Sequence, residues 1–225
     1  MKYDPERHHR RSIRLPGYDY TRPGVYFVTL VTHERQCLFG DIVGVGATCR
    51  VALNLWGEIA RAEWFQTAVV RPYVVLHEDE FVVMPNHVHG IIWIMDDAHR
   101  GAAANDEWNN NRGDDATNDE WNNNRGGADR RGAAPLRPYH ETPPINVIPG
   151  SLGAIVRAYK SAVTKHINTL RGTPGVLTWQ RNYYEHIIRD EQELQRIRQY
   201  ILDNPALWAE DRENPDVVAI RQGRR

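Results

Sequence analysis

The chain has 225 residues, of which 41% are hydrophobic, so it can bury a substantial core in one domain or in one domain with an insertion. No apolar run approaches the ~18 residues of a membrane span, so we expect no membrane partner. No signal peptide is expected, and the two cysteines suit neither a disulfide framework nor a zinc knuckle. We therefore expect a cytoplasmic protein. The net charge of −1 hides an uneven distribution, because residues 96–145 hold ten acidic and only six basic residues. Basic residues cluster over 7–14 and at the C-terminal end. Such clusters are typical either of a phosphate-binding segment or of a solvated tail.

The first part of the chain predicts several strands and one helix. Residues 26–32 are β-branched and aromatic, which is typical of a strand. Apolar residues at helical spacing predict a helix from about 51 to 69. The segments 73–76 and 81–84 flank an acidic kink and predict one bent strand or two short ones, and residues 87–94 predict the next strand.

Residues 96–149 differ from the rest in composition. Asn, Asp and Gly dominate, and the nine residues 105–113 recur at 118–126. Two copies of so short a unit do not make a solenoid, so we interpret them as a tandem duplication in a tolerant loop. We expect one domain over 1–225, interrupted at 96–149 by a disordered insertion that leaves the chemistry unchanged.

The next predicted helix has clear signals at both ends. An apolar stripe over 152–170 follows Ser151, a suitable N-cap residue, and ends before Gly172. The apolar stretches 176–180 and 183–188 then predict a last strand or a strand-like edge.

The last predicted helix begins at Asp190, where Glu193 completes a start resembling a capping box, and ends near Asn204, before Pro205. Without the insertion, the order is strand, helix, one or two strands, strand, helix, strand and helix. This order predicts an α+β fold in which helices pack on one face of an antiparallel sheet, and a ferredoxin-like arrangement fits best.

Two histidines stand one residue apart in the strand predicted at 87–94. Because side chains alternate along a strand, His87 and His89 point to the same face, about 7 Å apart along the backbone. Two imidazoles that project together from a buried sheet are well placed to hold a metal ion, although a structural pair of histidines would give the same pattern.

Tyr200 and Asn204 lie four residues apart on the last predicted helix, so they share one of its faces. A helix packed on the sheet can aim both side chains towards the histidines. Tyrosine, with a pKa of ~10, is a poor nucleophile unless a nearby cation polarises the phosphate that it attacks. Imidazole and carboxamide ligands suit Mn²⁺, or Mg²⁺ with less preference, and Zn²⁺ would also tolerate the histidines. The alternative is a packing tyrosine and an ordinary helix end.

Several motifs together carry a resemblance to a known family. The run 85–89, followed by an apolar strand, resembles the His-hydrophobic-His motif of HUH endonucleases. The segments 179–189 and 197–205, with 11–20 near the N-terminus, are similar to the single-tyrosine HUH transposases, in particular the REP-associated tyrosine transposase branch.

The resemblance implies a ferredoxin-like sheet and metal-dependent cleavage and rejoining of single-stranded DNA folded into hairpins. It gives His87 and His89 as metal ligands and Tyr200 as the nucleophile that forms a 5′-phosphotyrosine and frees a 3′-hydroxyl. Asn204 stands where relatives often carry glutamine, and we expect it to be a third ligand of Mg²⁺ or Mn²⁺. Related enzymes differ in whether one chain or a homodimer completes the site.

Other residues near these motifs are candidates for the same site. Tyr183 and Tyr184 are rival nucleophiles, but they precede the last predicted helix and lack an amide one turn on. Glu185 and His186 are candidates for the site, but we prefer to interpret them as part of a structural network. The residues expected to contact DNA phosphates are Arg10, Arg11, Lys160 and Lys165. The alternatives to a transposase are a replication-initiator or relaxase-like nickase and a non-catalytic nucleic-acid-binding module on the same fold.

Overall fold

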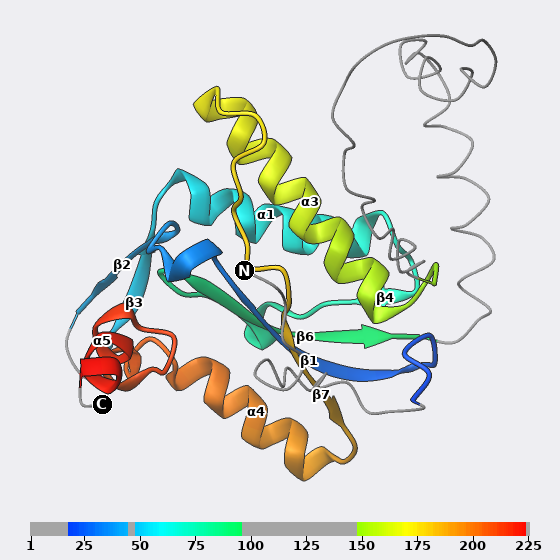
Figure 1. Ribbon diagram of the computed structural model, residues 1–225. Coiled ribbons are helices and arrows are strands. Elements are labelled where there is room, and N and C mark those ends of the chain that lie inside the picture. Colours follow the sequence, from blue (N-terminus) through cyan, green and yellow to red (C-terminus); the bar gives the residue numbers. More distant parts are fainter. Residues whose placement is uncertain (1–17, 45–47, 96–147, 224–225) are drawn as a thin grey trace, which may run out of the picture.

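The computed structural model describes residues 18–44, 48–95 and 148–223 (Figure 1). Most of the predicted insertion at 96–149, the basic run at 7–14 and both of its predicted DNA contacts, Arg10 and Arg11, therefore lie outside the described residues. The predictions made for them stay predictions.

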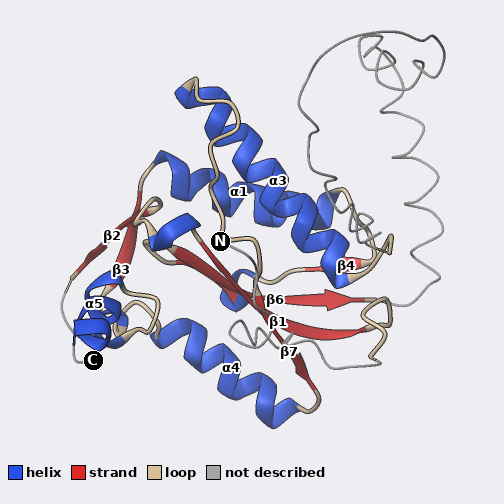
Figure 2. Ribbon diagram, viewed as in Figure 1, coloured by secondary structure: helices blue, strands red, loops and turns tan. Residues whose placement is uncertain are grey.

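The centre of the molecule is one antiparallel sheet (Figure 2). Its order is β4-β6-β1-β7, and β5 also pairs with β6, so the two histidines lie on a central strand. With one helix after β1 and another after β6, this is the ferredoxin-like order that the sequence predicted. The strands are β1 (Gly24–Val31), β4 (Val74–Val75), β5 (Phe81–Val83), β6 (His87–Ile94) and β7 (Tyr184–Ile188).

Helices cover both faces of this sheet (Figure 1). On one face, α1 (Leu55–Val69) and α3 (Leu152–Arg171) pack over the main hydrophobic core. On the other face, α4 (Glu191–Asp203) packs over a smaller core of Phe27, Ile91, Ile188, Leu194 and Ile201. The predicted α+β class is confirmed. The sequence predicted helices on one face of the sheet, and the structure also has α4 on the other face. This second face can be covered because the central strands carry apolar side chains on both sides.

The caps predicted from sequence hold α3 and α4. Ser151 Oγ accepts a hydrogen bond from the N–H of Ala154 at 3.3 Å, and Gly172 ends α3 with a left-handed φ of 65°. Asp190 Oδ1 accepts from the N–H of Glu193 at 2.7 Å. These local signals set the ends of both helices within a residue of the prediction.

The predicted start of α1 was wrong. Residues 50–53 form β3 (Arg50–Leu53), which pairs with β2 (Gly40–Val43) in a separate two-stranded sheet. The helix begins after Asn54, whose Oδ1 accepts from the N–H groups of Trp56 and Gly57 at 2.9 and 3.1 Å.

The other helical elements are short. They are the 3₁₀ turns η1 (His33–Arg35), η3 (Glu78–Glu80) and η6 (Trp208–Glu210), and the C-terminal helix α5 (Pro215–Gly223), which the sequence did not predict. None of the helices in the described segments combines the length and the apolar character that a membrane span requires.

Candidate active site

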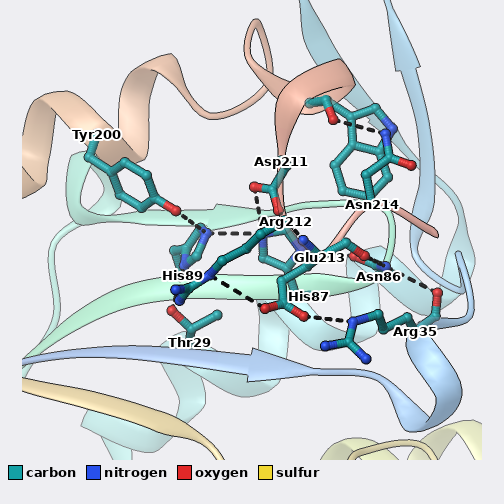
Figure 3. A network of polar contacts seen from close by, with 11 residues as sticks. Thr29, Arg35, Asn86, His87, His89, Tyr200, Asp211, Arg212, Glu213 and Asn214 are labelled. Carbon is teal, nitrogen blue, oxygen red and sulfur yellow. Dashed lines mark hydrogen bonds and ion pairs between the residues drawn. The ribbon is translucent and has the colours of Figure 1, made fainter. Parts of the chain in front are cut away.

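The two histidines of β6 are buried side by side on the face that α4 covers (Figure 3). Val88 between them joins the core under α1 and α3 on the opposite face. The Nε2 atoms of His87 and His89 lie 3.0 Å apart. Strand alternation therefore produces the paired imidazoles that the sequence predicted.

Polar neighbours orient both imidazole rings. Asn86 Nδ2 donates to the carbonyls of Arg35 and Glu213 at 3.0 and 2.7 Å, which turns Asn86 Oδ1 towards His87 Nδ1 at 2.8 Å. His87 therefore carries its proton on Nδ1 and leaves Nε2 as an acceptor. His89 Nδ1 lies 2.9 Å from the hydroxyl of Thr29 on β1. Such outer hydrogen bonds are typical of metal-binding histidines.

The imidazoles have the charge state that a metal requires. Burial lowers the pKa of His87 from 6.5 to about 3, and it also lowers the pKa of His89 well below 6.5. Both rings are therefore neutral near pH 7. Their Nε2 separation of 3.0 Å suits two ligands at adjacent positions on an ion with metal–nitrogen bonds of ~2.1 Å.

Asp211 supplies an acidic group that sequence reasoning missed. Its Oδ2 lies 3.9 Å from His87 Nε2, and one ligand atom from each of His87, His89 and Asp211 lies within 4.8 Å of the others. Glu213 fixes this turn, because its N–H donates to Asp211 Oδ1 at 2.6 Å and its carboxylate accepts from Arg35 Nε at 2.9 Å. Burial raises the pKa of Asp211.

Asn204 lies at the C-terminal end of α4 and is buried, with 2% of its surface exposed. Its Oδ1 has no hydrogen-bond partner among the described residues. An unpaired buried acceptor costs about 1–3 kcal/mol. A metal ion beside His87 would give this oxygen a partner, which is the role predicted for Asn204. The donor set of nitrogen and oxygen atoms thus fits a divalent cation.

Tyr200 reaches the histidine pair from α4. Its hydroxyl lies 3.3 Å from His89 Nε2, and its ring packs edge-on against Phe27 with centroids 6.0 Å apart. Burial, followed by the charge of Asp211, raises the pKa of the Tyr200 hydroxyl. The structure thus brings the predicted nucleophile and the predicted ligands together within one chain.

An open pocket of about 650 Å³ extends from Tyr200 and carries charge of both signs. Its charged or imidazole-bearing lining residues are His186, Glu193, Arg196, Glu210, Asp211 and Arg212. Arg212 also lies over the ring of Tyr184, 5.6 Å from its centroid. Tyr200 therefore lines an open, charged pocket.

The rival residues have other surroundings. Tyr183 packs against the main core, whereas Tyr184 lines the pocket and meets Phe27 edge-on at 6.2 Å. His186 Nε2 and Glu193 Oε1 lie 2.7 Å apart, so this histidine links β7 to α4. Tyr200 has the hydroxyl contact with His89, and its role as the nucleophile stays a prediction.

The two lysines predicted to contact DNA lie on α3, across the sheet from Tyr200. Lys160 Nζ donates to the carbonyls of Gln180 and Arg181 at 2.5 and 3.2 Å, and burial lowers its pKa to about 8. Lys165 lines a second pocket of about 430 Å³ together with Lys160 and Arg181. Lys160 thus already ties α3 to the segment before β7.

Comparisons with known proteins give one strong sequence relative. The chain is 34% identical to an uncharacterized protein of Haemophilus influenzae over 210 residues, which cover 93% of this chain and 96% of that protein. No family model matches the chain. A solved REP-associated tyrosine transposase bound to a REP hairpin aligns with 86% of this chain and 73% of its own, at 15% identity and a TM-score of 0.42, too low to infer a shared fold.

Proposed function

We propose that this chain, which belongs to the same protein family as the uncharacterized Haemophilus influenzae protein, is a metal-dependent endonuclease and strand transferase of the HUH type. The observation that carries the proposal is the 3.3 Å contact between the Tyr200 hydroxyl and His89 Nε2. It sets a candidate nucleophile beside two neutral imidazoles. The motifs that resemble single-tyrosine transposases support single-stranded hairpin DNA as the partner.

The residues that would hold the metal are His87 and His89, joined by the oxygens of Asp211 and Asn204. Mixed nitrogen and oxygen ligands suit Mn²⁺, with Mg²⁺ as the less favoured ion. When bound, such a cation polarises the scissile phosphate and offsets the charge that develops in the reaction. Since Tyr200 and both histidines meet within one chain, the proposed site does not require a second copy.

Tyr200 would act as the covalent nucleophile. Its oxygen forms a bond to the phosphorus, and the bond from phosphorus to the 3′ oxygen of the preceding nucleotide breaks. The phenolic proton leaves to water in the open pocket, and the released 3′ oxygen takes up a proton to become a hydroxyl. Attack of a 3′-hydroxyl on the phosphotyrosine reverses these steps and joins the strand.

We further propose that residues 1–225 form a single catalytic domain. Described segments on both sides of residues 96–147 contribute to one sheet, because β1 pairs with β6 before this region and with β7 after it. Tyr200 comes from the second segment and the histidines from the first. The region between them would be an insertion in the domain rather than a boundary between domains.

The test is covalent capture of end-labelled hairpin DNA with a single-stranded flank, resolved on a denaturing gel in the presence of Mn²⁺. Wild-type protein should form a protein–DNA adduct, and Tyr200→Phe should bind the DNA without forming it. Tyr184→Phe is the matched control, since it removes a hydroxyl from the same pocket and keeps the ring. An adduct that persists in Tyr200→Phe and disappears in Tyr184→Phe would move the nucleophile to β7. Hairpin binding by wild-type protein without any adduct would favour a non-catalytic binding module.

A further inference from the structure

We propose that Glu80 is a positioning residue that fixes the tyrosine helix α4 against the histidine strand β6; this inference rests on the proposed function. Glu80 lies in η3, between β4 and β5, outside both the histidine cluster and the pocket beside Tyr200. Its side chain is fully buried. It is the kind of group that a fold keeps only with specific partners.

Both carboxylate oxygens of Glu80 are taken, one by each half of the proposed site. Oε1 accepts from Nε and Nη2 of Arg198 on α4, at 2.8 and 2.6 Å. Oε2 accepts from Nε1 of Trp93 on β6 at 2.7 Å. Trp93 shares its strand face with His87 and His89 by alternation. One carboxylate therefore joins the helix that carries Tyr200 to the strand that carries the histidines.

Stability alone is a weak explanation for this contact. Apolar groups of similar shape can often replace a buried ion pair without loss of stability, because the cost of removing the charges from water offsets much of their attraction. A two-pronged arginine contact adds direction, since both nitrogens must meet one acceptor in a fixed geometry. The contact thus specifies the placement of α4 more tightly than apolar packing would.

The position of Arg198 on α4 makes the contact relevant to Tyr200. At ~100° per residue, Arg198 and Tyr200 lie on opposite edges of the apolar stripe formed by Leu194 and Ile201. The stripe alone would allow the helix to roll or slide on Phe27 and Ile91, and the contact between His186 and Glu193 holds it only at its first turn. Holding one edge at Glu80 limits that motion, and thereby keeps the Tyr200 hydroxyl beside His89.

The experiment compares Glu80→Gln with Glu191→Gln in the full chain. Glu191 is a matched control because its exposed carboxylate lies 3.8 Å from the same arginine. At saturating Mn²⁺ and hairpin DNA, Glu80→Gln should form the adduct roughly 10–100-fold more slowly, since small misplacements of a reacting group cost this much. The Mn²⁺ and DNA concentrations needed for saturation should stay within about twofold of wild type, as expected when only the reacting geometry is disturbed. Glu191→Gln should match wild type in rate.

Hydrogen exchange of α4 amides gives a readout that needs no activity. Glu80→Gln should speed exchange in α4 relative to β1 and β6, and Glu191→Gln should not. If Glu80→Gln does not fold, Arg198→Lys retains the charge, loses the two-pronged contact and should show the same slow adduct formation.

Each outcome decides the inference. An adduct rate for Glu80→Gln equal to that of an active wild type would overturn it. If wild-type protein forms no adduct, the proposed function fails. The link between α4 and β6 is then tested by hydrogen exchange alone. Unchanged exchange in Glu80→Gln then also overturns the positioning role, whereas faster exchange confined to α4 supports it.

Discussion

The two faces of the central sheet are built differently. Under α1 and α3, the side chains of β1 and β6 are apolar and join one large core that includes Trp64 and Tyr159. Under α4 the apolar core is small, and buried polar groups such as Glu80, His87 and His89 occupy the remaining surface. Because neighbouring residues of a strand point to opposite faces, the same two strands can provide stability on one side and chemistry on the other.

The largest expected effect distinguishes two single substitutions on β6, one on each face of the sheet. His89→Ala should abolish Mn²⁺-dependent cleavage. It should also abolish the rise in melting temperature that Mn²⁺ binding at the proposed site should produce in wild-type protein. Val88→Ala removes buried methyl groups and should cost about 1–3 kcal/mol of unfolding free energy, while the Mn²⁺-dependent rise remains. Thermal unfolding of both variants, with Mn²⁺ and with a chelator, measures the difference. A Mn²⁺ effect retained in His89→Ala would place the metal elsewhere.

Much of this two-faced arrangement could be predicted from sequence, because its signals are local. Alternation along 87–94 placed His87 and His89 together, and the caps at Ser151 and Asp190 gave the starts of α3 and α4. Helical spacing put Tyr200 and Asn204 on one side of α4.

What the sequence did not reveal depends on contacts between distant segments. Asp211 lies in a turn without periodicity, and it reaches the site because Glu213 is held by Arg35 and Asn86. Residues 50–53 could continue the helical pattern of α1, but pairing with β2 makes them a strand. Neither contact leaves a trace in the local pattern.

The histidines on the α4 face should make the free energy of unfolding depend on pH. The pKa of His87 is lowered from 6.5 to about 3 and that of His89 is also lowered, so below about pH 6.5 the unfolded chain binds protons that the folded, metal-free chain excludes. The free energy of unfolding should fall as the pH drops from 6.5 towards 3. The raised pKa of Asp211 acts in the opposite direction and reduces the slope.

Urea unfolding in the presence of a chelator, at about pH 7 and about pH 5, measures this loss, since each pKa unit is worth about 1.4 kcal/mol. The double variant His87→Ala, His89→Ala should lose less stability over this range than wild type. Equal losses would show that the histidines do not control the acid sensitivity of the protein.

The third prediction concerns Gly90, which follows the histidines on the strand and faces α1. A Cβ at this position would come within 2.3 Å of Trp64 Cζ2, a ring held in the main core. Gly90→Ala should therefore lower the free energy of unfolding by about 1–3 kcal/mol through overpacking. Denaturant unfolding measures it, and the Mn²⁺-dependent rise in melting temperature should persist. Loss of that rise without loss of stability would mean that Gly90 serves the metal face.

The smallest effect is expected from the lysines of α3, and it tests whether the α3 face takes part in DNA binding. Lys165→Gln should weaken hairpin binding and reduce the salt dependence of the affinity by about 0.7 in the logarithmic slope, as for one phosphate contact on a single strand. Lys160→Gln should instead reduce stability, because the Lys160 ammonium holds the carbonyls of Gln180 and Arg181. Affinities at several salt concentrations, set beside unfolding curves, distinguish the two. An unchanged slope in Lys165→Gln would confine DNA to the α4 face, where the charged pocket beside Tyr200 would then provide the contacts.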